Sequence, residues 1–140
     1  MRFDGRVFRA GKHWAIKVPI LGVASQGRTK KDAYAMIADA IESLVNRATF
    51  RIVVHPGKGQ YFEIGASDEA ALTAFLLRRT RLRAGLTLAE AAKRLGAKSL
   101  NAYARYEQGR AVPTVVKLSK LLSAVAPARD FVLVESRSSD

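Results

Sequence analysis

Residues 85–122 read GLTLAEAAKRLGAKSLNAYARYEQGRAVPTVVKLSKLL, and this stretch decides the fold of the C-terminal half. Thr87 and the glutamate three residues later have the spacing of a capping box at a helix N-terminus. Gly96 supplies the left-handed residue that commonly ends a helix. Ser99 is a second N-cap, and Gly109 ends the second helix as Gly96 ends the first. The stretch therefore predicts two short helices joined by a tight turn, a helix-turn-helix, followed by a loop and a third helix.

Six short motifs follow one another in this segment: G-L-T, A-E-A-A, L-G, S-x-N-x-Y, R-Y-E-Q-G and V-P-T. Their order and spacing over residues 77–122 resemble the lambda-repressor-like helix-turn-helix of the Xre family. The resemblance implies binding to operator DNA. Two features depart from the family pattern. Leu88 stands where the family commonly has a phosphate-contacting glutamine, and residues 97–99 make the turn one residue longer than usual.

The second helix of such a motif presents its N-terminal residues to the major groove. Asn can read adenine through two hydrogen bonds and Arg can read guanine. The alternative roles are helix capping for the asparagine and an intrahelical ion pair for the arginine. Glu107 is expected to be structural, because phosphates repel a carboxylate. The candidate DNA contacts, which lie away from the inward face of Tyr103 and Tyr106, are Lys98, Ser99, Leu100, Asn101 and Arg105.

A further helix is predicted before the helix-turn-helix. Ser67 is expected to cap it, acidic residues follow in its first turn, and arginines fill its last turns. Arg78 and Arg81 match basic positions of the Xre pattern. For both, a fold-supporting salt bridge and a DNA contact are equally compatible with the sequence.

The N-terminal half predicts an α+β domain, a small sheet with one helix on one face. Alternating or aromatic runs predict strands at residues 2–9, 13–19, 50–55 and 61–64, with a short extra strand near Ala24. Thr29 begins the helix. Trp14 shares a face of its strand with Ile16 and Val18, and it is expected to pack against the helix. The helix stripe comprises Ala33, Ile37, Ala40, Ile41 and Leu44.

Motifs in this half carry a second resemblance. W-A-I-x-V-P begins at Trp14, G-V begins at Gly22, Q-G-x-T ends at Thr29, and D-A begins at Asp32. Over residues 3–65 these motifs resemble the HicB antitoxin domain, a cut-down ribonuclease H-like fold. The resemblance implies a type II antitoxin that neutralises a HicA-like mRNA-cleaving toxin and represses its own operon. Members commonly carry a C-terminal DNA-binding unit. The toxin-contacting residues are not identified by the sequence.

The apolar stripes and the two resemblances divide the chain into three parts: a HicB-like domain at 1–65, for which the resemblance implies toxin binding, a helix-turn-helix domain at 66–126 and a tail at 127–140. The chain has 24 Lys and Arg against 12 Asp and Glu, a net charge of +12, which favours a polyanionic partner. Both halves share the excess, with 11 basic and 5 acidic residues in 1–65. The tail contains the apolar run Phe131-Val132-Leu133-Val134, which either pairs with another protomer to form a homodimer or higher oligomer, or folds back on the helices.

The composition gives little support for other classes of protein. There is no cysteine, and no apolar run is long enough for a signal peptide or a membrane span, so a cytoplasmic protein is expected. No nucleotide-binding loop or metal-ligand spacing occurs, so neither a cofactor nor a metal is expected. His13 and His55 are expected on the sheet surface. Two alternatives remain: a transcription regulator with a ligand-sensing N-terminal domain, and a metal-dependent nuclease. An enzyme is not expected, because of the acids Asp4, Asp32, Asp39, Glu42 and Glu63 only Asp4 and Glu63 lie on predicted strands.

Overall fold

A computed structural model describes residues 1–137, which divide into two compact units. The first comprises Met1–Glu69 together with the described residues from Glu135 onward, and the second is Ala70–Val134. The last three positions of the predicted tail lie outside the described residues. No helix within residues 1–137 is long and apolar enough to cross a membrane.

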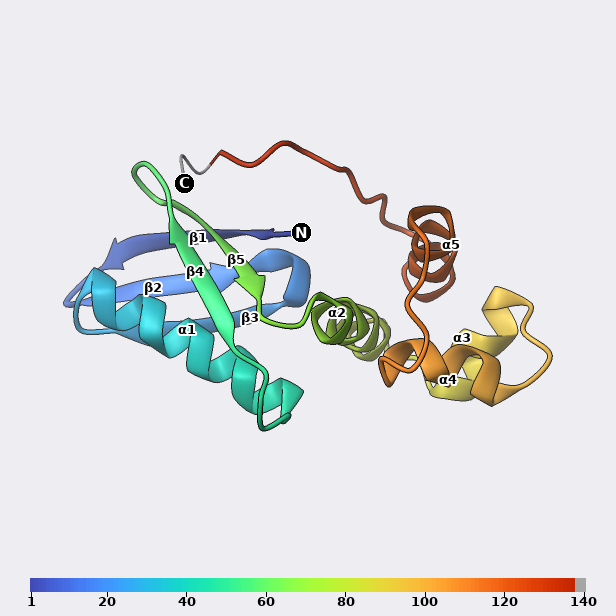
Figure 1. Ribbon diagram of the computed structural model, residues 1–140. Helices are drawn as coiled ribbons and strands as arrows, with labels where there is room; N and C mark the ends of the chain where they lie inside the picture. The colour runs from blue at the N-terminus through green and yellow to red at the C-terminus, as the bar shows by residue number, and fades with distance from the viewer. Residues whose placement is uncertain (138–140) are drawn as a thin grey trace. The chain divides into compact units, whose positions relative to one another are not determined.

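The first unit is a five-stranded antiparallel sheet with one long helix across one face (Figure 1). The strand order is β3-β2-β1-β5-β4, so the N-terminal strand lies at the centre of the sheet. The α+β class predicted from the sequence is thereby confirmed. The elements are β1 (Phe3–Ala10), β2 (His13–Val18), the 3-10 turn η1 (Pro19–Leu21), β3 (Val23–Gly27), α1 (Lys30–Val45), β4 (Ile52–Pro56) and β5 (Tyr61–Ala66).

The core of this unit lies between the sheet and α1. Val7 of β1 and Ile16 of β2 are opposite each other in the register, and both are buried. Ile37 and Ile41 of α1 are also fully buried, as the helical stripe predicts. Trp14 is half-buried and pairs with Gly27 at the end of β3.

The start of α1 is fixed by local contacts. The Thr29 hydroxyl accepts a hydrogen bond from the Asp32 N–H at 3.0 Å. The Asp32 carboxylate accepts from the N–H of Arg28, one residue before the cap, at 2.9 Å. A Cβ at Gly27 would stand 2.3 Å from the backbone nitrogen of Ala33, so only glycine allows β3 and α1 to come this close. The interval between Gly27 and Ala33 therefore sets where the helix meets the sheet.

The sheet extends to Ala66, and the helix cap predicted just after it was wrong. Gly65 lies inside β5, where it pairs with Val53 of β4, so the chain is still in the sheet at this point. Ser67 does not cap the following helix, which starts at Glu69. Its hydroxyl instead accepts from the N–H of Arg51 at 3.0 Å and ties the end of the sheet together. Ser67 therefore stabilises the end of the sheet and does not cap α2.

The second unit consists of four helices: α2 (Glu69–Arg83), α3 (Leu88–Leu95), α4 (Leu100–Glu107) and α5 (Val115–Val125) (Figure 1). Thr87 and Glu90 form the predicted capping box, with both hydrogen bonds at 3.1 Å. Gly96 ends α3 at a φ of 75°. Large buried side chains from three helices, Leu77, Tyr103 and Leu121, are fully enclosed. The helix-turn-helix predicted from capping and glycine spacing is thereby confirmed.

The tail after α5 forms neither helix nor strand as far as residue 137. Val132, Leu133 and Val134 are exposed, so this part of the tail does not fold back on the helices. Beyond it, Ser136 and Arg137 return to the first unit, where both donate hydrogen bonds to the carboxylate of Glu63. The tail is thus anchored by its polar end and leaves its apolar run uncovered.

Candidate nucleic-acid interface

Helix α4 presents one face to the core of the second unit and the other to solvent. Tyr103 and Ala104 are buried, whereas Asn101, Ala102 and Arg105 are exposed on the opposite side. Ser99 begins the helix, and its hydroxyl accepts from the Ala102 N–H at 3.3 Å. The cap fixes the direction in which the first turn of α4 leaves the α3–α4 turn, and with it the position of the exposed side chains.

The exposed face of α4 opens into a hollow of about 390 Å³. Its lining contains three cationic side chains, Lys98, Arg105 and Lys117, and no acidic one. The ammonium group of Lys117 lies 5.8 Å from the centre of the Tyr106 ring, within the range of a cation–π contact. A concave surface lined by cations suits the phosphate backbone of a nucleic acid. The remaining lining residues are Leu95, Gly96, Ala97, Ala102, Tyr106 and Ala111.

The predicted contact residues are distributed unevenly around this hollow. Lys98 and Arg105 line it. Asn101 and Leu100 are exposed on the first turn of α4 but outside the lining, and Leu100 retains 44% of its accessible surface. Arg78 is exposed on α2. Sequence reasoning missed Lys117, because its approach to α4 depends on how α5 packs and not on any local motif.

The structure gives Arg81 a structural role, one of the two expected for it. Its Nε and Nη2 donate to the Glu107 carboxylate at 2.7 and 3.0 Å, and Nη1 donates to the Leu86 carbonyl at 2.8 Å. The two side chains are 11% and 6% exposed. The hydrogen bonds to Glu107 raise the pKa of Arg81. Arg81 therefore holds α2 to the end of α4 and is withdrawn from the candidate DNA contacts, and the structural role predicted for Glu107 is confirmed.

A second concentration of positive charge lies near the end of α2. Desolvation and the neighbouring charges of Arg129 and Arg79 lower the pKa of Arg83. The three arginines therefore form a second positively charged region of this unit.

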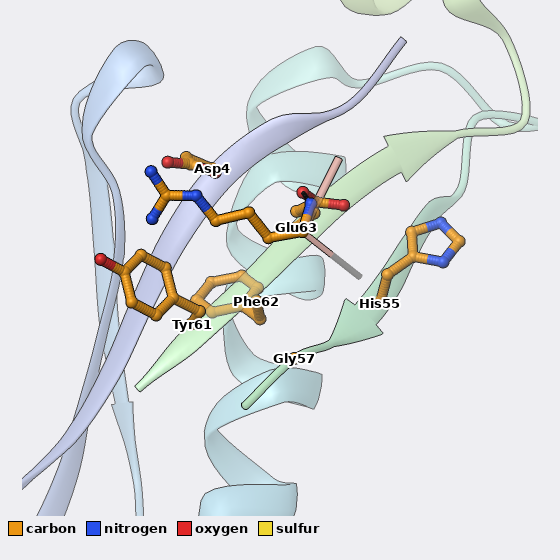
Figure 2. Close-up of a pocket in the computed structure, with 7 residues that line it drawn as sticks. Asp4, His55, Gly57, Tyr61, Phe62 and Glu63 are labelled. Carbon is orange, nitrogen blue, oxygen red and sulfur yellow. Dashed lines mark hydrogen bonds between the residues drawn. The ribbon is translucent and has the colours of Figure 1, made fainter. Parts of the chain in front are cut away.

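The first unit carries a polar row on the sheet face that α1 does not cover. Asp4, Glu63 and His55 lie opposite one another on β1, β5 and β4, as Figure 2 shows. The hollow beside them has a volume of about 10 Å³, about the space of one water molecule. No group of three or more His, Cys, Asp or Glu side chains in residues 1–137 is arranged to hold a metal ion.

The carboxylate of Glu63 is engaged by neighbouring donors. Arg2 donates to it at 3.2 Å, the Arg137 N–H donates at 2.9 Å, and the Ser136 hydroxyl donates to the same carboxylate. Burial opposes ionisation of Glu63, but these hydrogen bonds and the charge of Arg2 outweigh it and lower its pKa. Asp4 lies 3.6 Å from Arg6, whose guanidinium also stacks 3.9 Å from the Tyr61 ring centre. Both carboxylates are therefore paired with cations.

The comparisons with known proteins bear on the second unit. Residues 74–129 match the family model described as a helix-turn-helix domain. This range contains α3, α4 and α5 and most of α2. A comparison with curated proteins found no match. The geometry and the family match together identify the C-terminal unit as a DNA-binding helix-turn-helix domain.

Proposed function

We propose that the chain is a HicB-like antitoxin of a type II toxin-antitoxin system. Its N-terminal unit binds and neutralises a HicA-like mRNA-cleaving toxin, and its helix-turn-helix domain represses the operon that encodes both proteins. The protein acts in the cytoplasm, as a homodimer and without enzymatic activity. The observation that carries the proposal is the joining of a helix-turn-helix domain to a separate α+β unit that bears the HicB-like motifs.

The DNA-binding half of the proposal rests on α4. Exposed Asn101 and Arg105 can reach base edges in the major groove, while Lys98 and Lys117 line a hollow suited to phosphates. A single helix-turn-helix covers one half-site. Two copies are therefore needed to read an inverted repeat whose half-sites are about 34 Å apart, one helical turn, or a multiple of that distance.

The toxin-binding half of the proposal rests on where the residues of the HicB-like motif lie in the fold. Pro19 opens the turn between β2 and β3, Gly27 allows α1 to approach the sheet, and Thr29 caps α1. Because these residues stabilise the fold, the resemblance supports a shared architecture and does not locate the toxin-binding surface. The partner surface must lie elsewhere. The sheet face opposite α1 is the best candidate, because exposed or half-exposed side chains of β1 and β2 lie there without a covering helix.

The sheet face opposite α1 also disfavours the two alternative functions, ligand sensing and metal-dependent nuclease activity. A hollow of about 10 Å³ has no room for a metabolite, which disfavours ligand sensing at this place. A metal-dependent nuclease needs carboxylates available to divalent ions, whereas Glu63 is held by Arg2, Ser136 and Arg137.

Separation of the two activities in the intact chain tests the proposal. The full chain is co-expressed with the toxin encoded beside it, and growth and a promoter reporter are read together. We expect the wild type to restore growth and repress the reporter, and Asn101→Ala to restore growth without repression. Failure of the wild-type chain to restore growth or to bind the toxin would refute the antitoxin role. The reporter decides separately whether the chain represses its operon.

A further inference from the structure

The sheet face opposite α1 carries two aromatic rings on neighbouring strands. In β1, buried residues alternate with more exposed ones, which places Phe8 on the face away from α1. Tyr61 of β5 lies opposite Arg6, two residues before Phe8, so the two rings share this face. Residues in this diagonal relation are about 7–8 Å apart. Phe8 is half-buried and Tyr61 retains 36% of its accessible surface, so both rings are presented to solvent (Figure 2 shows Tyr61).

The neighbours of Phe8 on this face are small. Across β2 it pairs with Ala15, and Ala10 follows it on its own strand. On the other side, β5 begins only at Tyr61, so no residue of that strand lies beside Phe8. A ring bordered by alanines is open to a flat ligand that lies against it. Nucleobases stack on such rings whatever their identity, because every base has a π-face.

Each of the two rings has a cation beside it. The Lys17 ammonium lies 5.9 Å from the centre of the Phe8 ring, and the Arg6 guanidinium lies 3.9 Å from the centre of Tyr61. Arg6 and Lys17 are themselves opposite each other in the register of β1 and β2. The acid of β1, Asp4, lies 3.6 Å from Arg6, and β2 and β3 contain no acidic residue. The surface around the two rings therefore has an excess of positive charge, which complements a polyanion.

We propose that this face of β1, β2 and β5 binds a single-stranded nucleic acid. One base stacks on Phe8, the next stacks on the Arg6 guanidinium over Tyr61, and the phosphates between them contact Lys17 and Arg6. A duplex presents only base edges in its grooves and cannot stack on Phe8. The inference does not rest on the antitoxin role. A toxin seated on the same face and a bound strand would exclude each other.

Fluorescence anisotropy of the full chain with labelled strands of about 12 nucleotides tests the proposal. The probes are oligouridylate, oligodeoxythymidylate and a random DNA duplex. Phe8→Leu keeps an apolar side chain but removes the ring, and it should weaken binding of the single strands by about tenfold or more without weakening the duplex. Phe8→Trp keeps a flat ring and should bind within about twofold of the wild type. Tighter binding of one strand identifies RNA or DNA as the preferred ligand, and either supports the proposal.

Charge variants test the same face independently of Phe8. Lys17→Gln should weaken binding of the single strands and reduce the salt slope by about 0.7, the effect of one lost phosphate contact. Lys31→Gln is the matched control and should change neither, because Lys31 is an exposed lysine of α1, which covers the other face of the sheet. Lys98→Gln, in the helix-turn-helix domain, should weaken the duplex and leave the single strands unchanged.

Three results contradict the proposal: a wild type that binds neither strand, single-strand binding unchanged by Phe8→Leu, or equal losses for Lys17→Gln and Lys31→Gln. The first would leave this face to a protein partner. Circular dichroism melting establishes that each variant is folded. If Phe8→Leu does not fold, the comparison of Lys17→Gln with Lys31→Gln decides the question. The assay contains no toxin, so a negative result would leave the antitoxin proposal standing.

Discussion

Arg81 and Glu107 form a nearly buried ion pair with several hydrogen bonds in the helix-turn-helix domain. The guanidinium satisfies a carboxylate and a main-chain carbonyl from two other segments, and both side chains are nearly buried. Breaking such a pair leaves an uncompensated buried charge, whereas replacing both partners with apolar residues removes that penalty. The contact therefore fixes the packing of α2 on α4 more than it adds net stability.

We expect Glu107→Ala to lower the free energy of unfolding by about 3–5 kcal/mol, because Arg81 is left buried without its partner. The double variant Arg81→Met with Glu107→Leu should recover most of that loss. Urea unfolding followed by circular dichroism measures both. Arg105→Ala, which removes an exposed arginine from the same helix, is the control and should leave stability unchanged. Equal losses for the single and double variants would mean that packing, and not the buried charge, sets the cost.

Glu63 should make the first unit sensitive to acid. Its pKa is lowered in the folded state by hydrogen bonds from Ser136, Arg137 and Arg2, which outweigh the opposing effect of burial. The folded state therefore binds fewer protons than the unfolded state at acid pH, and stability rises with pH. The contribution is fully present above the ordinary glutamate pKa of about 4.3 and is lost as pH falls through the lower folded value. Melting temperatures of wild type and Glu63→Gln between neutral pH and about pH 3 should converge as the pH falls. Parallel curves would show that Glu63 does not titrate in this way.

At the scale of single elements, α4 separates two kinds of DNA contact. Asn101→Ala should weaken binding by about 1–3 kcal/mol at one position of each half-site, because a bidentate base contact is lost. Lys98→Ala and Lys117→Ala should weaken all sequences alike and each reduce the salt slope by about one. Titration of cognate and random duplexes at several salt concentrations measures these effects. Equal losses on both duplexes for Asn101→Ala would rule out base reading by this residue.

One added carbon atom, the Cβ of Gly27→Ala, tests how closely β3 must pack against α1. A Cβ on Gly27 would stand 2.3 Å from the Ala33 nitrogen, and helix backbone cannot yield as a side chain can. Gly27→Ala should therefore cost at least about 1–3 kcal/mol, in the range of overpacked cores. Gly11→Ala is the control: its φ of 61° is strained for alanine, at about 1–2 kcal/mol, but nothing lies within 4 Å of the added carbon. A Gly27→Ala variant no less stable than Gly11→Ala in urea would mean that α1 moves away from β3 without penalty.

The elements that the sequence predicted well are those fixed by near neighbours. The caps at Thr29, Thr87 and Ser99 each bond an N–H three residues away, so their spacing alone located three helices. The central position of β1 could not be predicted, because it pairs with β5 across nearly the whole first unit. The role of Arg81 stayed undecided for the same reason, since its partner Glu107 is 26 residues away. Of the candidate contacts, those on α4 followed from local pattern, whereas Lys117 required the packing of α5.

At the scale of the whole molecule, the chain crosses between its units twice. The first crossing follows β5, and the second is the tail, whose Ser136 and Arg137 bond Glu63 of the first unit. Each unit nevertheless has its own buried core, Ile37 and Ile41 in the first and Tyr103 and Leu121 in the second. Separate cores are what allow parts of a chain to fold independently.

Cutting the chain after Glu69 should therefore yield two folded fragments with one activity each. Residues 1–69 should melt at a lower temperature than the same unit in the full chain, because Glu63 keeps Arg2 but loses Ser136 and Arg137. If the antitoxin proposal holds, this fragment restores growth to toxin-arrested cells, since blocking the toxin needs only the surface of the first unit. Residues 70–140 should bind operator DNA with an affinity that falls steeply with salt. In the full chain, toxin should change operator affinity by the same factor by which operator changes toxin affinity. A folded and expressed 1–69 fragment that fails to restore growth, beside a full chain that succeeds, would show that neutralisation depends on the C-terminal unit or on its oligomerisation.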